Sequence, residues 1–150
     1  MSSKNGPVQV SNVADLYQDV AQAQFNCPLF VARVAAGFPS PAEDYAEKRL
    51  ELSDLIKHPV STFFVKVSGD SMIDAGIFDG DLLIVDKAEP VRNGHICVAI
   101  VDGEFCVKQF EQASGRVRLI SANPNFPPLE IAPEQDFELW GRVIYVLRKC

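Results

Sequence analysis

The chain has 150 residues, of which 47% are hydrophobic, and a formal net charge of −6 at pH 7. That size and composition predict one globular domain with a hydrophobic core. An acidic chain is poorly suited to the phosphate backbone of DNA, which proteins bind through basic patches. No apolar run is long enough to span a membrane, and the N-terminus lacks the pattern of a secretion signal. We therefore expect a cytoplasmic protein that contacts neither membranes nor specific DNA sequences directly.

Residues 1–36 are predicted to form an arm that precedes the main domain, residues 37–150. The first seven residues show no hydrophobic periodicity and are expected to be disordered, whereas Val13–Val20 has the apolar spacing of a short helix. The charges of the arm cancel one another, so the main domain holds the whole net charge; the residues concerned are Lys4, Asp15, Asp19 and Arg33.

The segment around residue 36 is predicted to be extended. Phe30–Gly37 combines β-branched and small residues, and Pro39 and Pro41 prevent a helix after it. An extended segment can bind as an added strand beside a protease groove, where backbone hydrogen bonds hold a scissile carbonyl. An ordinary linker would have a similar composition. The next stretch, Ala42–Leu52, is mixed in charge and compatible with a loose helix.

From residue 62 onward the pattern is one of short strands separated by turns. Clusters of Gly, Asp, Asn and Pro divide this part of the chain into runs rich in β-branched and aromatic residues. These runs predict a mostly antiparallel β domain. The predicted strands are Thr62–Val67, Asp81–Asp86, Gly94–Val101, Glu104–Gln109, Arg116–Ser121 and Phe137–Val146.

A serine lies in the turn that follows the first of these strands. The turn reads Ser68-Gly69-Asp70-Ser71-Met72, and a glycine-punctuated segment comes after it. A serine hydroxyl held on a tight turn, with backbone N–H groups nearby that can stabilise an oxyanion, has the setting of a nucleophile. A serine in such a turn can equally be a turn residue that caps its own backbone. The turn alone leaves both interpretations open.

Asp102 and Gly103 are predicted to form the two-residue turn of a β-hairpin. They separate two apolar runs, and both central residues of a type I′ turn need positive φ. The alternation of side chains then puts Lys108 on the same face as Cys106 and Phe110. The register that follows pairs Val101 with Glu104, Ile100 with Phe105, Ala99 with Cys106, Val98 with Val107 and Cys97 with Lys108.

Apolar surroundings of this kind would change the chemistry of Lys108. Burial disfavours the ammonium form, so the pKa of Lys108 is expected to fall from its ordinary value toward neutrality. A neutral lysine amine can act as general base for a serine hydroxyl. Alternatively, Lys108 lies on an edge strand and extends its amine to solvent, as many strand lysines do.

Other residue types that often form sites do not show the required spacing. The cysteines lack a Cys-x-x-Cys pair and neighbouring histidines, so we expect no zinc site; they are Cys27, Cys97, Cys106 and Cys150. Cys97 and Cys106 lie in predicted core strands and are expected to be small buried hydrophobic residues, kept reduced in the cytosol, and not a disulfide. The two histidines lie in a loop and at a strand start, where a catalytic role is not expected; they are His58 and His95. The aspartates of the glycine-rich turns are expected to shape the turns without binding metal; they are Asp70, Asp74, Asp79 and Asp81. No metal and no cofactor is therefore predicted.

Several separate stretches together resemble the self-cleaving LexA/UmuD peptidase family, also called S24. The stretches Ser68–Asp74, Asp79–Asp86 and Val101–Lys108 occur in the order typical of that family. The stretch Ala35–Pro41 looks like the internal cleavage site of its members. The resemblance runs from about residue 35 to the C-terminus. It is specific because several motifs agree in type and order.

The resemblance implies a site and a fold. Ser71 would be the nucleophile and Lys108 its general base, with backbone N–H groups of Ser71 and Asp70 stabilising the oxyanion. The cut would fall between Ala36 and Gly37, a pair found in repressors of the family where its mutagenesis proteins have Cys-Gly. The fold would be the β-clip catalytic domain that the family shares with signal peptidases, preceded by an extended arm.

The resemblance also implies a biological role. Members of the mutagenesis branch cleave themselves after DNA damage, stimulated by the filament of RecA on single-stranded DNA. The processed homodimer then joins a UmuC-type Y-family polymerase in error-prone translesion synthesis during the SOS response. The alternative is a self-cleaving transcriptional repressor like LexA. It is disfavoured because residues 1–36 are neither basic nor long enough for the DNA-binding domain that precedes the cut in repressors.

Overall fold

The computed structural model describes residues 9–12, 26–30, 34, 36–39 and 47–150. The chain divides into two compact units, one made of residues 1–14 and 58–150 and the other of residues 15–57. The predicted disorder of the first seven residues and the predicted helix at Val13–Val20 lie outside the described residues. Within the described part of the chain, no helix is both long enough and apolar enough to cross a membrane.

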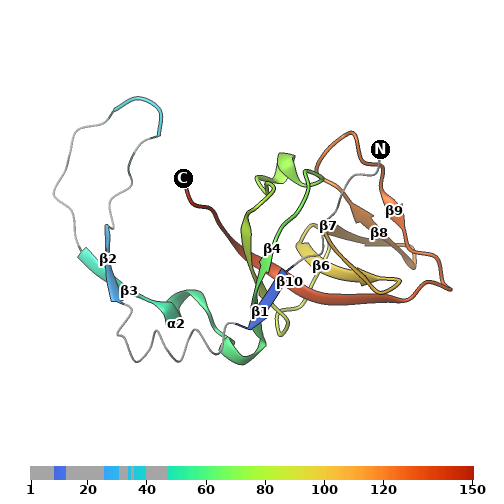
Figure 1. Ribbon diagram of the computed structural model, residues 1–150, viewed down its shortest axis with the longest axis horizontal. Helices are drawn as coiled ribbons and strands as arrows, with labels where there is room; N and C mark the ends of the chain where they lie inside the picture. Colours follow the sequence, from blue (N-terminus) through green and yellow to red (C-terminus); the bar gives the residue numbers. More distant parts are fainter. Residues whose placement is uncertain (1–8, 13–25, 31–33, 35, 40–46) are drawn as a thin grey trace. The chain divides into compact units, whose positions relative to one another are not determined.

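The larger unit is built on an antiparallel sheet in which the described strands follow the order β1-β4-β5-β10-β6-β7-β8-β9 (Figure 1). Two short 3-10 helices, η1 (Pro59–Ser61) and η2 (Ile73–Ala75), lie in its connections. The predicted mostly antiparallel β class is confirmed. The strands are β1 (Gln9–Asn12), β4 (Thr62–Lys66), β5 (Leu82–Asp86), β6 (Ile96–Val101), β7 (Glu104–Ala113), β8 (Arg116–Ile120), β9 (Leu129–Glu130) and β10 (Phe137–Leu147).

The smaller unit contains a second, two-stranded sheet. Strand β2 (Asn26–Phe30) pairs antiparallel with β3 (Glu47–Glu51), and the short helix α2 (Leu52–Leu55) follows. The prediction of a loose helix over residues 42–52 is therefore wrong for the residues of β3. Their mixed charges fit either a helix or a strand, and pairing with β2 decides in favour of the strand. Of the predicted extended segment, residues 30–37, Phe30 is the last residue of β2, whereas Ala36 and Gly37 lie in a bend over residues 36–38; residues 31–33 and 35 lie outside the described residues.

The β6–β7 hairpin has the predicted register at every pair. Asp102 (φ 48°) and Gly103 (φ 82°) both adopt the positive φ that the turn requires. Strand β7 continues past its predicted end to Ala113, and a second turn with positive φ, at Ser114 and Gly115, leads into β8. Strand β7 therefore pairs on both sides, with β6 and with β8, and lies in the interior of the sheet.

Two hydrophobic clusters lie on the two faces of the β6–β7 hairpin, as the alternation of side chains requires. Val98 and Val107 belong to the first cluster, whereas Cys97 and Ala99 belong to the second. Lys108 shares the face of the second cluster. The buried members of the first cluster are Val65, Val67, Met72, Ile77, Leu83, Val85, Val98 and Val107, and those of the second are Cys97, Ala99, Phe110 and Leu119.

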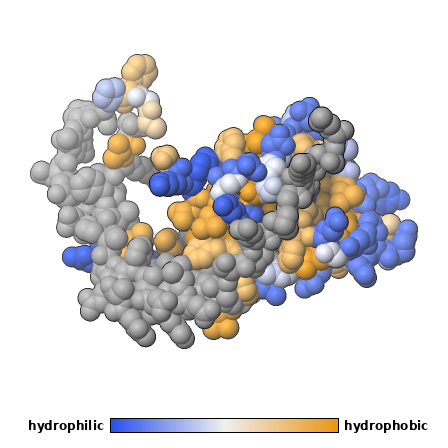
Figure 2. Space-filling model, viewed as in Figure 1, coloured by the Kyte–Doolittle hydropathy of each residue, from blue (hydrophilic) through white to orange (hydrophobic). Residues whose placement is uncertain are grey.

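The surface of the larger unit is mixed in character. Figure 2 shows hydrophobic residues among charged ones on its visible face. Three neighbouring apolar residues near the end of β10 are exposed, namely Tyr145, Val146 and Leu147.

Candidate active site

The turn that carries Ser71 is held in place by the loop that follows it. At the end of β4, Val67 donates its N–H to the Asp81 carbonyl and accepts a hydrogen bond from the Gly80 N–H, both at 2.9 Å. Gly69, with φ 96°, donates its N–H to Asp79 Oδ1 at 2.8 Å. Asp79, through its side chain, and Asp81, through its backbone, therefore both hold the turn in place.

Met72 anchors the turn from within the core. Its side chain is 2% exposed and belongs to the first hydrophobic cluster, as expected for a residue that packs beneath the turn. Its carbonyl accepts hydrogen bonds from the N–H groups of Ala75 and Ile77, at 3.0 and 3.2 Å. Ser71, its neighbour in the chain, is half-buried. The nucleophile candidate is thus attached to a fixed residue.

A three-residue segment after β8, Ser121–Asn123, connects to the same turn; we call it the bridge segment. Asn123 Nδ2 donates to the Asp70 carbonyl at 2.9 Å, and the Ala122 carbonyl accepts a hydrogen bond from the Asp74 N–H at 2.8 Å. These two contacts lie on either side of Ser71 in the chain. The bridge segment therefore fixes the turn from the side of β8.

Lys108 lies on β7 and is half-buried. Its position on an interior strand contradicts the alternative in which it extends to solvent from an edge strand. Burial lowers the pKa of Lys108, as predicted, and the neighbouring Cys106 thiol opposes this with a smaller effect. Lys108 Nζ donates a hydrogen bond to Ser121 Oγ at 2.8 Å and lies 5.6 Å from the centre of the Phe126 ring. The amine is therefore held at the first residue of the bridge segment.

The bridge segment brings the two predicted catalytic residues into one network without bonding them to each other. Lys108 contacts its first residue, and the turn of Ser71 contacts its second and third. The amine donates to Ser121 and not to Ser71, and Ser71 Oγ makes no hydrogen bond with any other described residue. Catalytic hydrogen bonds often form only when the substrate is bound.

The predicted oxyanion donors are backbone groups of the same turn. The Asp70 carbonyl faces Asn123. It belongs to the same peptide group as the Ser71 N–H, and in a trans peptide these two groups point in opposite directions. The Ser71 N–H is thus directed away from Asn123, and no described residue accepts it. The second predicted donor, the Asp70 N–H, stays a prediction.

The predicted cleavage site belongs to the other unit of the chain. Ala36 and Gly37 lie in an exposed bend, next to Phe38, whose exposed fraction is 93%. Ser71 and Lys108 belong to the larger unit. The cut between Ala36 and Gly37 therefore stays a prediction.

Sequence reasoning missed Ser121, the residue that Lys108 contacts. The turn at Ser114 and Gly115 sets the register of β7 with β8, from the pair Ala113 and Arg116 onward. Continued one residue past the end of β8, that register places Lys108 opposite Ser121. A two-residue turn ending in glycine, between runs in which polar and apolar residues are mixed as in a strand, was the signal that could have found this contact.

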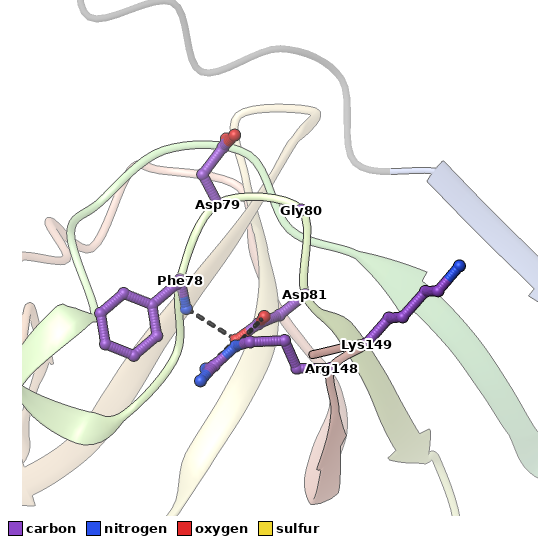
Figure 3. Close-up of a pocket in the computed structure, with 6 residues that line it drawn as sticks. All are labelled: Phe78, Asp79, Gly80, Asp81, Arg148 and Lys149. Carbon is purple, nitrogen blue, oxygen red and sulfur yellow. Dashed lines mark hydrogen bonds and ion pairs between the residues drawn. The ribbon is translucent and has the colours of Figure 1, made fainter.

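An ion pair between the buried Asp81 and the half-exposed Arg148 stabilises the loop that follows the turn of Ser71 (Figure 3). Asp81 is 1% exposed, and its carboxylate accepts two hydrogen bonds of 2.6 Å from Arg148 and one of 2.8 Å from the Phe78 N–H. The Arg148 bond is the main reason why the pKa of Asp81 lies below its ordinary value. Asp79 points away from Arg148 (Figure 3), toward its contact with Gly69. The loop borders an open cavity of about 500 Å³.

The histidines have partners other than Ser71. His58 Nδ1 lies 2.6 Å from Oδ2 of the buried Asp86, and His95 Nδ1 accepts the Arg92 N–H at 3.0 Å. In the described part of the chain, His58, Asp86 and Glu89 form the group whose spacing could suit a metal. The contacts of Asp86 with His58 and with the Ala88 N–H already satisfy its carboxylate. Glu89, the third member of the group, forms an ion pair with Arg142 at 3.9 Å.

The structure describes free thiols at Cys97, Cys106 and Cys150, which confirms the prediction that Cys97 and Cys106 do not form a disulfide. Burial raises the pKa of Cys97 to about 12 and also raises that of Cys106. These two thiols, which share a face with Lys108, are therefore neutral at physiological pH.

Comparisons with known proteins agree with this architecture. The chain matches the peptidase S24-like family over residues 28–144. It is 45% identical over 127 residues to protein SamA of Salmonella typhimurium, a match that covers 84% of this chain and 88% of SamA. It is 41% identical over 129 residues to protein ImpA of Escherichia coli, covering 81% of this chain and 83% of ImpA. The LexA repressor of Stenotrophomonas maltophilia is 41% identical over 118 residues, which cover 79% of this chain and 56% of the repressor. The chain therefore belongs to the peptidase S24-like family of serine peptidases and has the LexA/UmuD-like fold of that family.

Proposed function

We propose that the chain is a serine endopeptidase that cuts itself between Ala36 and Gly37, with Ser71 as nucleophile and neutral Lys108 as general base. The observation that carries this proposal is the bridge segment, which contacts both the half-buried amine and the turn of Ser71. Membership of a serine peptidase family adds independent support.

In the proposed reaction, Lys108 accepts the proton of Ser71 as the serine oxygen attacks the carbonyl carbon of Ala36. The N–H groups of Ser71 and Asp70 stabilise the oxyanion of the tetrahedral intermediate. The bond to Gly37 then breaks, and the new amine of Gly37 takes the proton from Lys108. Water hydrolyses the ester on Ser71, which leaves a carboxylate on Ala36 and restores the enzyme.

The environment of each group suits this task. Burial favours the neutral form of Lys108, so the amine can accept a proton at a lower pH than an exposed lysine could. The turn of Ser71 is fixed by Met72 and Asn123, which reduces the loss of orientational freedom on reaching the transition state. The exposed bend at Ala36 and Gly37 is accessible, and its small side chains fit a narrow groove.

Cleavage would also change the edge of the main sheet. Strand β1 belongs to residues 1–36 and pairs antiparallel with β4. After the cut, the fragment would be held by non-covalent contacts, which include the pairing of β1 with β4 and of β2 with β3, and its departure would expose the edge of β4. An exposed edge is a surface on which another protein can add a strand. Precursor and product would thus differ in a binding surface as well as in length.

The processed product is proposed to act in error-prone translesion synthesis. In this proposal the filament of RecA on single-stranded DNA stimulates the cut, and the product joins a UmuC-type polymerase. The support is the resemblance to the mutagenesis branch and the extent of the match to SamA and ImpA. A self-cleaving repressor like LexA is the alternative. The net charge of −6 favours the accessory subunit, and specific binding of an operator by the intact chain in a gel shift would favour the repressor.

The end of β10 supports the proposal of a homodimer. Strand β10 pairs with β6 through Phe137–Arg142 and with β5 through Arg142–Leu147. In the described part of the chain, the side of β10 that faces away from β5 therefore lacks a strand beyond Arg142. Tyr145, Val146 and Leu147 are between 41% and 56% exposed there. We expect Val146→Lys to shift the chain toward monomer in sedimentation experiments, because it places a charge in an apolar interface.

Mass spectrometry of the purified chain at alkaline pH tests the peptidase directly. Raising the pH deprotonates Lys108, so the wild type should cut itself without a partner and yield a fragment that begins at Gly37. Ser71→Ala and Lys108→Ala should stay intact under the same conditions. A wild-type chain that stays intact, also in the presence of RecA filament, would contradict the proposal.

A further inference from the structure

Ser121 is a polar residue in direct contact with the proposed base that the proposed reaction does not use. It directly follows β8 and is half-buried, and its Oγ accepts the hydrogen bond of Lys108 Nζ at 2.8 Å. It is also the first residue of the bridge segment, whose other two residues hold the turn of Ser71. A side chain in this position can influence the amine without touching the substrate.

We propose that Ser121 is a positioning residue: its hydroxyl holds the Lys108 amine at the bridge segment that also fixes the turn of Ser71. This inference rests on the proposed function. It adds that the distance between base and nucleophile is set by three consecutive residues, Ser121 for the base and the other two for the turn.

Positioning is needed because a lysine side chain is flexible. Ordering its rotatable bonds costs conformational entropy, which the contacts of the amine must offset. Two contacts of Lys108 are available for this, the hydrogen bond to Ser121 and the Phe126 ring at 5.6 Å. Without the hydroxyl, the amine would sample several rotamers and would less often reach Ser71.

The backbone around Ser121 argues against a role as nucleophile. The amide that follows it, the Ala122 N–H, donates to Met72 Sδ at 3.4 Å, and the Ala122 carbonyl accepts the Asp74 N–H. These groups are committed to holding the turn. The Ser71 N–H, in contrast, donates to no described residue and is free to stabilise an oxyanion.

The hydroxyl of Ser121 also affects the protonation of the amine. An oxygen that accepts a hydrogen bond from an ammonium favours the charged form. The titratable groups that face Lys108 are Cys106, two residues away on β7, and Cys97, opposite on β6. Both thiols are neutral at physiological pH because burial raises their pKa values. Removing the hydroxyl should therefore lower the pKa of Lys108 further, because neither of these two thiols carries a charge that would compensate.

The test is the rate of self-cleavage as a function of pH for the wild type, Ser121→Ala and Ser121→Thr. For Ser121→Ala we expect the rate to rise at a lower pH than in the wild type, to a plateau about 10- to 100-fold lower. Ser121→Thr keeps the hydroxyl, so the midpoint of its pH–rate profile should equal that of the wild type. A merely structural role would lower the rate without moving the midpoint.

A titration of Lys108 by NMR, in chains that carry Ser71→Ala, separates this inference from the proposed function. The Lys108 signals should titrate at a lower pH once Ser121→Ala is added, whether or not the wild type cleaves itself. Unchanged titration, or an unchanged rate profile in Ser121→Ala, would overturn the positioning role. Cleavage that survives in Ser71→Ala and disappears in Ser121→Ala would make Ser121 the nucleophile and overturn both proposals.

Discussion

The two proposed catalytic residues are positioned by different kinds of structure. Lys108 lies on a regular interior strand, where the register of two hairpins determines its neighbours. Ser71 lies on an irregular turn that depends on contacts with distant parts of the chain, including Asp79 and Asn123. Local sequence therefore determines the setting of the base, whereas tertiary contacts determine that of the nucleophile. We therefore expect variants near Lys108 and variants near Ser71 to have different effects on the rate of self-cleavage and on its pH dependence.

The largest effect is expected at Lys108 itself. Lys108→Met keeps the length of the side chain and removes the amine, so self-cleavage should fall by about 10³-fold or more at every pH. In the wild type, the rate should rise with pH through a pKa that burial has lowered from the ordinary value of lysine. Mass spectrometry over a pH series measures both. Lys66→Met, on the exposed end of β4, is the matched control and should leave the rate unchanged.

A smaller effect is expected where the turn meets the bridge segment. Asn123→Ala removes the hydrogen bond to the Asp70 carbonyl, which should slow self-cleavage about tenfold and lower the free energy of unfolding by about 1–3 kcal/mol. The midpoint of the pH profile should stay in place, because the variant does not touch Lys108. Asn125→Ala, at an exposed position, is the control. A shifted midpoint in Asn123→Ala would show that turn and base are not positioned separately.

The smallest effect on cleavage is expected at Asp81, whose influence should appear in stability instead. Its pKa in the folded chain lies below the ordinary value of 3.8, so its ion pair stabilises the fold above that value. The stabilisation is lost as the pH falls through the lowered pKa. In urea unfolding, Asp81→Asn should be less stable than the wild type at pH 7, and the difference should shrink below pH 3.8. Asp74→Asn, which removes an exposed carboxylate that forms no ion pair with Arg148, is the control for the loss of a carboxylate.

The sequence predicted the parts of the fold whose pattern is local. The turn at Asp102 and Gly103 determined the whole register of the β6–β7 hairpin, and the six predicted strands of the main sheet are all present. Strands β1 and β9 were not predicted because they are short and contain few β-formers; a partner strand holds them in place. The helix predicted over residues 42–52 is wrong at β3 because pairing with β2, and not the local sequence, makes these residues a strand.

The candidate site shows the same division. The burial and lowered pKa of Lys108 followed from its place in the hairpin. The contacts of the bridge segment with the turn join residues about fifty positions apart, and no local sequence pattern predicts such a contact. Asp81 was expected to shape a turn, yet it is the buried partner of Arg148, which lies 67 residues later.

The most direct test of the account is covalent labelling of the intact chain with a fluorophosphonate at alkaline pH, followed by peptide mass mapping. The reagent reacts with serines whose hydroxyl a base has activated, so it reports the pairing of base and nucleophile without requiring the cut. We expect the label on Ser71 in the wild type and no label in Lys108→Met. Labelling of Ser121 instead, or labelling of Ser71 that persists in Lys108→Met, would contradict the account.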